Sequence, residues 1–210
     1  MTYLQKNVIL NTETPAALII LLLTTTVSLL ALYGQPQWID KGLFRPYCFL
    51  RRRQYYTLFT HGLLHSSVSH LLFNMLTFYF FAFTLERTIG TPRFVLLYLL
   101  ALCLSEVRTY LQQADNPRYA TLGASGAVAA ILFAEIVYYP YQSLFIMFIP
   151  VPIPAPLFAV GYVAYSVYLS RRGDDGVNHN AHIDGAITGL LFVALTDINA
   201  YRELIAYLMR

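Results

Sequence analysis

The stretch LGASGAVAAILFAEIVYY, residues 122–139, decides how this chain must fold, because its only charged side chain is Glu135. An apolar segment of this length is typical of a helix inside a membrane. At its start, Gly123-Ala124-Ser125-Gly126 predicts a sharp turn whose small neighbours let other groups approach the serine hydroxyl. The sequence therefore places a candidate nucleophile, Ser125, inside a membrane.

The composition of the whole chain also indicates a membrane protein. Hydrophobic residues make up 57% of the 210 residues and charged residues 12%, which is about half the charged share of a soluble domain. The mean hydropathy is +0.53, and we expect a single membrane domain over residues 1–210. Cys48 and Cys103 lack the spacing of a metal site or a disulfide framework. The net charge of +3 is too small to favour a nucleic-acid partner.

Six apolar ranges predict an all-α membrane protein with six transmembrane helices. The first range lacks the basic flank and cleavage site of a signal peptide, so we expect an anchor. Alternate prolines between Ser143 and Pro156 predict an extended loop that contacts the membrane. We expect the basic segment Gly34–Tyr55 to be a partly inserted loop near lipid headgroups. The predicted helices cover residues 15–33, 63–85, 94–111, 122–139, 156–170 and 181–196.

Two polar residues of the second range, His70 and Asn74, lie on one helix face because they are four residues apart. Polar side chains inside a membrane are costly and suggest function. Two fixed hydrogen-bond donors beside a serine would stabilise the negative charge that develops on a carbonyl oxygen under attack. A polar clasp between two helices is the alternative that this pair alone leaves open.

The last predicted helix carries His182, Gly185 and Gly189 on one face, and such glycines let another helix backbone come close. A histidine brought to Ser125 in this way could take and return the serine proton, although a structural hydrogen-bonding role for His182 is equally open. Asp184 points away from this face, so we expect a Ser–His pair without it. The expected partner helix has small residues at Gly123, Ala124, Gly126, Ala127, Ala129 and Ala130.

Four motifs together resemble the rhomboid family of intramembrane serine proteases. The motifs are His61-Gly-Leu-Leu-His65-Ser-Ser-Val-Ser-His70-Leu-Leu-Phe-Asn74, Glu86-Arg-Thr-Ile-Gly90, Gly123-Ala-Ser125-Gly126 and Ala181-His182-Ile-Asp-Gly185-Ala-Ile-Thr-Gly189. The resemblance runs from about Tyr55 to Gly189, and four motifs in this order are far more specific than any one of them.

The resemblance implies a six-helix rhomboid-like bundle with Ser125 and His182 as the catalytic dyad. It also implies that His70, Asn74 and the Ser125 backbone N–H bind the oxyanion. The implied activity is endopeptidase cleavage of transmembrane segments within the lipid bilayer, in a multi-pass protein of the inner cell membrane, without metal or cofactor. Bacterial members have cytoplasmic termini and a site that opens outward, whereas the loop charges of this chain leave the orientation open.

Three positions depart from the family pattern. Tyr56-Thr57 stands where the family often has Trp-Arg, and Asp184 stands where a small or apolar residue is usual. Ala129 stands where some members have a tyrosine that stacks on the catalytic histidine, which leaves the ring orientation of His182 unexplained.

Two other classes of function compete with a protease. A di-iron oxygenase would need more histidine ligands than the five in this chain, and it would not explain the glycines around Ser125. A catalytically weak or inactive rhomboid-like factor that binds transmembrane helices is the second alternative, although such a factor would have no need to keep both Ser125 and His182.

The fifth predicted helix is the expected gate through which a substrate helix enters sideways from lipid. Prolines precede it and the Gly173-Asp-Asp-Gly176 loop follows it, so both of its ends are weakly constrained. We expect that shrinking Phe158 and Tyr162 together loosens this helix and speeds cleavage of transmembrane substrates.

Overall fold

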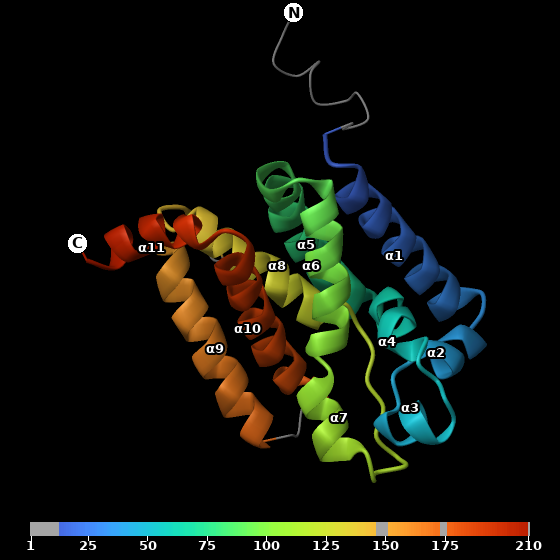
Figure 1. The fold of residues 1–210 in the computed structure, drawn as a ribbon. Coiled ribbons are helices and arrows are strands. Elements are labelled where there is room, and N and C mark those ends of the chain that lie inside the picture. Colours follow the sequence, from blue (N-terminus) through green and yellow to red (C-terminus); the bar gives the residue numbers. More distant parts are fainter. Residues whose placement is uncertain (1–12, 146–150, 173–175, 210) are drawn as a thin grey trace, which may run out of the picture.

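The computed structural model describes residues 13–145, 151–172 and 176–209, and most of them lie in helices (Figure 1). The elements run in the order α1 (Pro15–Tyr33), α2 (Gln37–Gly42), α3 (Pro46–Arg51), α4 (Thr57–Thr60), η2 (His61–Leu63), α5 (Val68–Ile89), α6 (Thr91–Leu104), α7 (Val107–Gln113), α8 (Ser125–Tyr138), β1 (Ser143–Phe145), β2 (Pro152–Pro154), α9 (Ala155–Arg172), α10 (His179–Thr196), η3 (Ile198–Ala200) and α11 (Tyr201–Leu208).

Helix α8 lies in the middle of the bundle, with α5 and α6 on one side and α9 and α10 on the other (Figure 1). Every residue from Gly126 to Val137 is buried. A helix that is apolar around its whole circumference must be covered by other helices, and the small side chains of α8 allow those helices to approach closely. The candidate nucleophile therefore begins the most enclosed helix of the molecule.

The length and hydropathy of the helices identify a membrane protein. Among the described residues, three helical segments are long and apolar enough to cross a membrane, namely Pro15–Tyr33, Val68–Ile89 and Thr91–Gln113. A fourth arises if α10 and Ile198–Leu208, bent by 110°, count as one broken span. Helix α8 is apolar but has only 14 residues. The predicted count of six transmembrane helices is therefore larger than the number that length and hydropathy establish.

A helix lies at each of the six predicted ranges, but the bounds of the second range were wrong. That helix begins at Val68 rather than residue 63, because His61–Leu63 forms a separate 3₁₀ turn and the Ser67 hydroxyl caps α5 by accepting the His70 backbone N–H at 3.1 Å. It ends at Ile89 rather than residue 85, because Gly90, with φ of 80°, turns the chain.

The third predicted range, 94–111, is two helices rather than one. Helix α6 ends at Leu104, and α7 begins at Val107 after the break at Ser105 and Glu106. Both residues at the break are buried. The first range, 15–33, coincides with α1, and the remaining ranges differ by at most three residues at either end, with α8 beginning at Ser125, α9 at Ala155 and α10 at His179.

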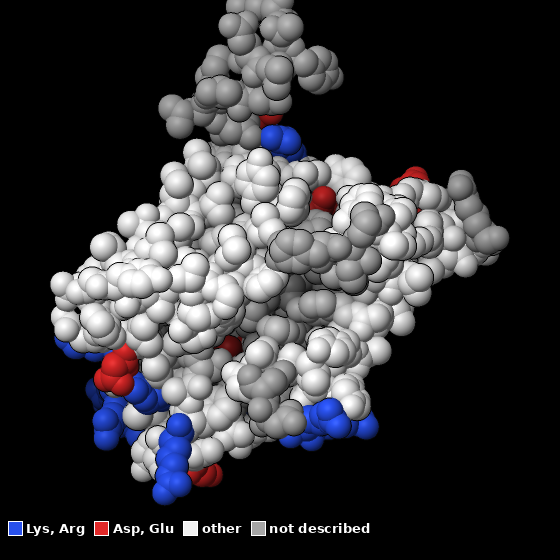
Figure 2. All heavy atoms as spheres, turned by 180° about the vertical axis from the view of Figure 1, so that it is seen from behind, with Lys and Arg blue, Asp and Glu red and all other residues white. Residues whose placement is uncertain are grey.

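The predicted extended loop Ser143–Pro156 contains a short antiparallel hairpin of β1 and β2, so the fold is not purely helical. Residues 146–150 of that loop lie outside the described ranges. The predicted inserted loop Gly34–Tyr55 contains the two short helices α2 and α3. Most of the Lys and Arg seen in Figure 2 lie at one end of the molecule, below a broad surface with few charges, and one further basic side chain lies at the opposite end. Figure 1 places α2, α3 and α7 at the end that holds most of them.

Glu86 joins α1 to the turn between α5 and α6, although it is fully buried. Its two carboxylate oxygens accept the backbone N–H groups of Ala16 at 3.1 Å and Ala17 at 2.7 Å, and Oε1 also accepts the Thr91 hydroxyl at 2.7 Å. Because the first N–H groups of a helix have no partner within it, this carboxylate caps α1 from another part of the chain.

Candidate active site

Ser125 is the first residue of α8, so its backbone N–H is among those that the helix itself leaves unpaired. The preceding Gly123 has φ of 121°, a conformation that favours glycine. Backbone hydrogen bonds hold this turn at both ends: Thr121 exchanges N–H···O bonds of 2.8 and 2.9 Å with Phe44, and the Gly123 N–H donates to the His61 carbonyl at 2.9 Å. The serine is thus presented from a backbone that these bonds fix before it and that continues as α8 after it.

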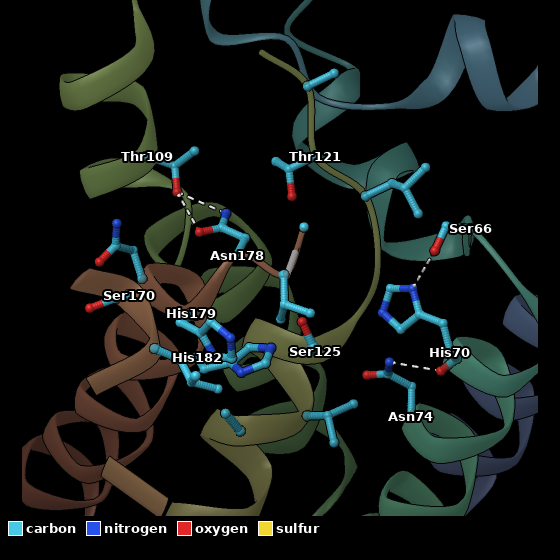
Figure 3. Close-up of a pocket in the computed structure, with 18 of the residues that line it drawn as sticks. Ser66, His70, Asn74, Thr109, Thr121, Ser125, Ser170, Asn178, His179 and His182 are labelled. Carbon is cyan, nitrogen blue, oxygen red and sulfur yellow. Dashed lines mark hydrogen bonds between the residues drawn. The ribbon is translucent and has the colours of Figure 1, made fainter. Parts of the chain in front are cut away.

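Helices α8 and α10 pack backbone against backbone along the face of Gly185 and Gly189. A Cβ atom on Gly185 would lie 2.1 Å from the Gly126 carbonyl oxygen, and one on Gly189 would lie 2.1 Å from that of Ala130. No side chain larger than hydrogen fits at such distances. This approach brings His182 close to Ser125, and Figure 3 shows the two side chains next to one another.

Both side chains line a cavity of about 1080 Å³. Helix α5 borders the cavity on one side and α9 on the other, while α8 and α10 form its floor (Figure 3). The lining combines polar groups with apolar ones such as Phe73, Val128 and Leu132. Such a lining would suit an apolar peptide segment, with the polar groups of the cavity binding one of its backbone peptide groups.

The ring of His182 lies between two aromatic side chains. Tyr162 of α9 stacks on it with ring centroids 6.1 Å apart and planes inclined by 30°. His179, one turn earlier on α10, meets it edge-on at 5.4 Å and 83°. Sequence reasoning placed Tyr162 on the gate helix but did not place it against the histidine.

The amino end of α10 is anchored to the break between α6 and α7. The Asn178 side-chain oxygen caps α10 by accepting the Ala181 N–H at 3.2 Å, and its amide nitrogen donates to Glu106 Oε2 at 3.2 Å and to Thr109 Oγ1 at 2.9 Å. The unpredicted break at Glu106 therefore fixes where α10 starts, one turn before His182.

Asp184 points away from Ser125 and pairs with α7. Its Oδ1 lies 2.5 Å from Arg108 Nη2. The carboxylate therefore joins α10 to α7 instead of orienting His182. Among the described residues, no group of three or more histidine, cysteine, aspartate or glutamate side chains could hold a metal ion.

His70 lies against the turn that precedes the serine. A Cβ on Gly123 would lie 2.8 Å from His70 Cε1 and 3.0 Å from Nε2, so the ring occupies the space that this glycine leaves. The other ring nitrogen, Nδ1, lies 3.2 Å from the Ser66 hydroxyl. Ser66 was not predicted, and only its position four residues before His70, within the quoted motif, could have signalled it.

Asn74 lines the same cavity and donates one amide N–H to the His70 carbonyl at 3.0 Å. An asparagine amide has two such groups, so one remains for another acceptor. The hydrogen bonds seen here for His70 and Asn74 stay within α5 and the residues just before it, which differs from a clasp between two helices.

His65 supports His70 from outside the cavity. Its ring meets that of His70 edge-on at 4.8 Å. Because the Ser28 hydroxyl donates to the Leu63 carbonyl at 2.7 Å, it accepts from His65 Nδ1 at 2.9 Å. Burial, together with the neighbouring His70, lowers the pKa of His65 to about 3. His65 therefore stays uncharged at neutral pH and adds no positive charge beside the serine turn.

Comparison with known proteins points to one family. The model of the family described as "Rhomboid domain" matches residues 52–197. The chain is 31% identical over 147 residues to "RHOMBOID-like protein 12, mitochondrial" of Arabidopsis thaliana, covering 62% of this chain and 43% of that protein. It is 30% identical over 131 residues to "Presenilin-associated rhomboid-like protein, mitochondrial" of Rattus norvegicus, covering 61% and 35%.

A third relative is "Rhomboid-related protein 1" of Caenorhabditis elegans, which is 30% identical over 153 residues, covering 70% of this chain and 41% of that protein. The match with this chain therefore spans less than half the length of each of these relatives.

Proposed function

The chain belongs to the rhomboid family, and on that basis we propose that it is an intramembrane serine endopeptidase that cleaves transmembrane segments of other membrane proteins. One observation carries the proposal. Ser125 and His182 come from two helices in direct backbone contact and lie next to one another in a cavity that His70 and Asn74 also line. A nucleophile, a base and hydrogen-bond donors at one place are what acyl transfer from a peptide bond requires.

In the proposed reaction, His182 takes the hydroxyl proton of Ser125 while the serine oxygen attacks the substrate carbonyl. The negative charge on the carbonyl oxygen is bound by the Ser125 backbone N–H, by His70 and by Asn74. If the Ser66 hydroxyl donates to His70 Nδ1, the ring proton stays on Nε2, the ring nitrogen that lies closer to Gly123. His182 then gives its proton to the leaving amine, and water hydrolyses the acyl-serine.

We propose that the substrate enters between α5 and α9, because both helices line the cavity and α9 has few buried residues. The apolar lining suits a transmembrane segment, whose peptide bonds become accessible only where its helix unwinds. Small residues beside the scissile bond would fit a narrow site around Ser125.

The proposed architecture has six transmembrane helices, at α1, α5, α6 with α7, α8, α9 and α10. In this architecture the short helix α8 need not cross the full thickness of the bilayer, because the cavity brings water to its first turn. We propose the inner membrane of a cell as the location, and the word "mitochondrial" in the names of two relatives makes the mitochondrion the alternative. Fractionation of the native cells with marker proteins for each membrane decides between them.

The test is a cleavage assay on the purified protein in liposomes, with a panel of single-span substrates. We expect cleavage by the wild type and none by Ser125→Ala, whereas the matched Ser143→Ala variant, at an exposed position in β1, cleaves normally. A fluorophosphonate probe should label the wild type and Ser143→Ala but not Ser125→Ala. A chain that binds the substrates without cutting them, and that the probe does not label, would instead be the non-cleaving rhomboid-like factor.

A further inference from the structure

The ring that stacks on His182 belongs to a helix that carries neither member of the dyad. Tyr162 lies on α9, whereas Ser125 lies on α8 and His182 on α10. The two rings are offset and inclined by 30° with centroids 6.1 Å apart, within the range in which aromatic rings attract one another. On α8, one turn after Ser125, Ala129 lines the same cavity with only a methyl group. The orientation of His182, which the sequence left unexplained, thus has a physical source in α9.

Tyr162 is itself held by two other rings. Phe133 of α8 meets it at 5.6 Å and 59°, and Phe158, one turn earlier on α9, lies at 6.1 Å and 31°. The position of the tyrosine ring therefore depends on the packing of α9 against α8. The second ring neighbour of His182 is His179, which meets it edge-on. Rotation of the His182 imidazole would therefore break contacts with a ring on α9 and a ring on α10.

Helix α9 is the least buried of the long helices around the cavity. Its buried residues are Ala155, Pro156 and Ser166, of which the first two lie at its amino end beside the β1–β2 hairpin. A helix attached mainly at one end can tilt about that end. Any tilt that widens the cavity between α5 and α9 also moves Tyr162 relative to His182.

We propose that Tyr162 is a positioning residue for His182, and that the reactivity of the dyad therefore depends on the placement of α9. The inference rests on the proposed protease function. From the sequence we expect that shrinking Phe158 and Tyr162 together speeds cleavage. For Tyr162 this proposal predicts the opposite: removing its ring should slow cleavage, even though it also loosens α9.

The test compares substitutions that keep or remove the ring. In Tyr162→Leu we expect kcat to fall by roughly 2- to 12-fold, the fold-change that one aromatic pair contributes, while KM stays within about twofold. The rate of fluorophosphonate labelling against pH should shift its midpoint in Tyr162→Leu, because the environment of His182 has changed. Tyr162→Phe, which keeps the ring, should restore the wild-type rate and midpoint. Tyr165→Leu is the matched control, because Tyr165 lies on the same helix with 62% of its surface exposed.

Full activity of Tyr162→Leu, or equal losses in Tyr162→Leu and Tyr162→Phe, would overturn the proposal. Tyr162→Met serves as a second ring-free variant if the leucine variant does not fold. NMR of the protein with isotope-labelled histidine tests the stacking independently of the protease function, because the measurement needs no substrate. The His182 signal, assigned with His182→Gln, should move in Tyr162→Leu and stay in Tyr162→Phe. An unmoved signal would refute the stacking, whereas a moved signal in a protein that cleaves nothing would refute only the protease function.

Discussion

The two sides of the cavity are built in opposite ways. On the α8–α10 side the backbones touch, since the position of a Gly185 Cβ lies 2.1 Å from the Gly126 oxygen and α8 is buried along nearly its whole length. On the α9 side few residues are buried, and a Cβ at Gly161 would have no atom within 4 Å. The proposed dyad of Ser125 and His182 lies on the tightly packed side. The loosely packed side borders the space through which a substrate would enter. The rigid part of the site is therefore built by α8 and α10, whereas substrate access depends on α9.

The largest expected effect comes from the chemical groups of the tight side. Ser125→Ala and His182→Ala should each abolish cleavage, and the double variant should be no worse than either, because members of a dyad act as a unit and their losses do not add. The measurement is single-turnover cleavage of a transmembrane substrate in liposomes. Residual activity in either variant that disappears only in the double variant would show that the two side chains act independently.

The next largest effect is expected at the oxyanion donors of α5. Asn74→Ala should lower kcat by about 10²–10³-fold, the typical cost of one lost donor, and His70→Ala should be at least as damaging. The melting temperature should stay near that of the wild type, because the hydrogen bonds seen for Asn74 and His70 are local. Thr88→Val, at the far end of α5, is the control. A full rate combined with a lower melting temperature would mean that Asn74 is only structural.

A direct comparison of the two sides uses one added methyl group. Gly185→Ala forces α10 away from α8 and should lower the rate by about 10²-fold, the cost of displacing a reacting group by about 1 Å. Gly161→Ala, the same change on α9, has open space and should be neutral in rate. Cleavage rates and melting temperatures of both variants check this. Equal behaviour of the two would contradict the difference in packing between the sides.

The smallest effect is expected from loosening α9 without touching Tyr162. Val163 packs against the cluster of Leu132 and Phe133, so Val163→Ala should speed cleavage of transmembrane substrates by about two- to fivefold, which corresponds to about 0.5–1 kcal/mol of lost packing. Val160→Ala, at an exposed position of α9, should match the wild type. A slower Val163→Ala variant would indicate that α9 is needed in its closed position.

Much of this arrangement was predictable from sequence because the signals are local. Apolar runs located a helix at each of six ranges, and the spacing of Gly185 and Gly189 predicted a face for close helix contact. The break at Ser105 and Glu106 escaped prediction because its cause is remote: Glu106 accepts a hydrogen bond from Asn178, more than 70 residues away in the sequence. Such pairings leave no periodic pattern in the chain.

The stack of Tyr162 on His182 escaped prediction for a different reason. Helix α9 has aromatic residues at Phe158, Tyr162, Tyr165 and Tyr168, on more than one face. Composition alone therefore does not say which ring turns inward. Only the rotation of the helix, set by its contacts with α10 and α8, selects Tyr162.

The capping of α1 by Glu86 also sets an order of assembly during synthesis. The two backbone groups that Glu86 binds lie 70 and 69 residues before it in the chain. At a translation rate of about 5–20 residues per second, roughly 4–14 s pass between synthesis of the helix and synthesis of its cap. The nascent first helix must therefore wait in the insertion machinery or at the bilayer surface with its leading N–H groups hydrated. Its final depth is reached only when the hairpin that carries Glu86 has followed.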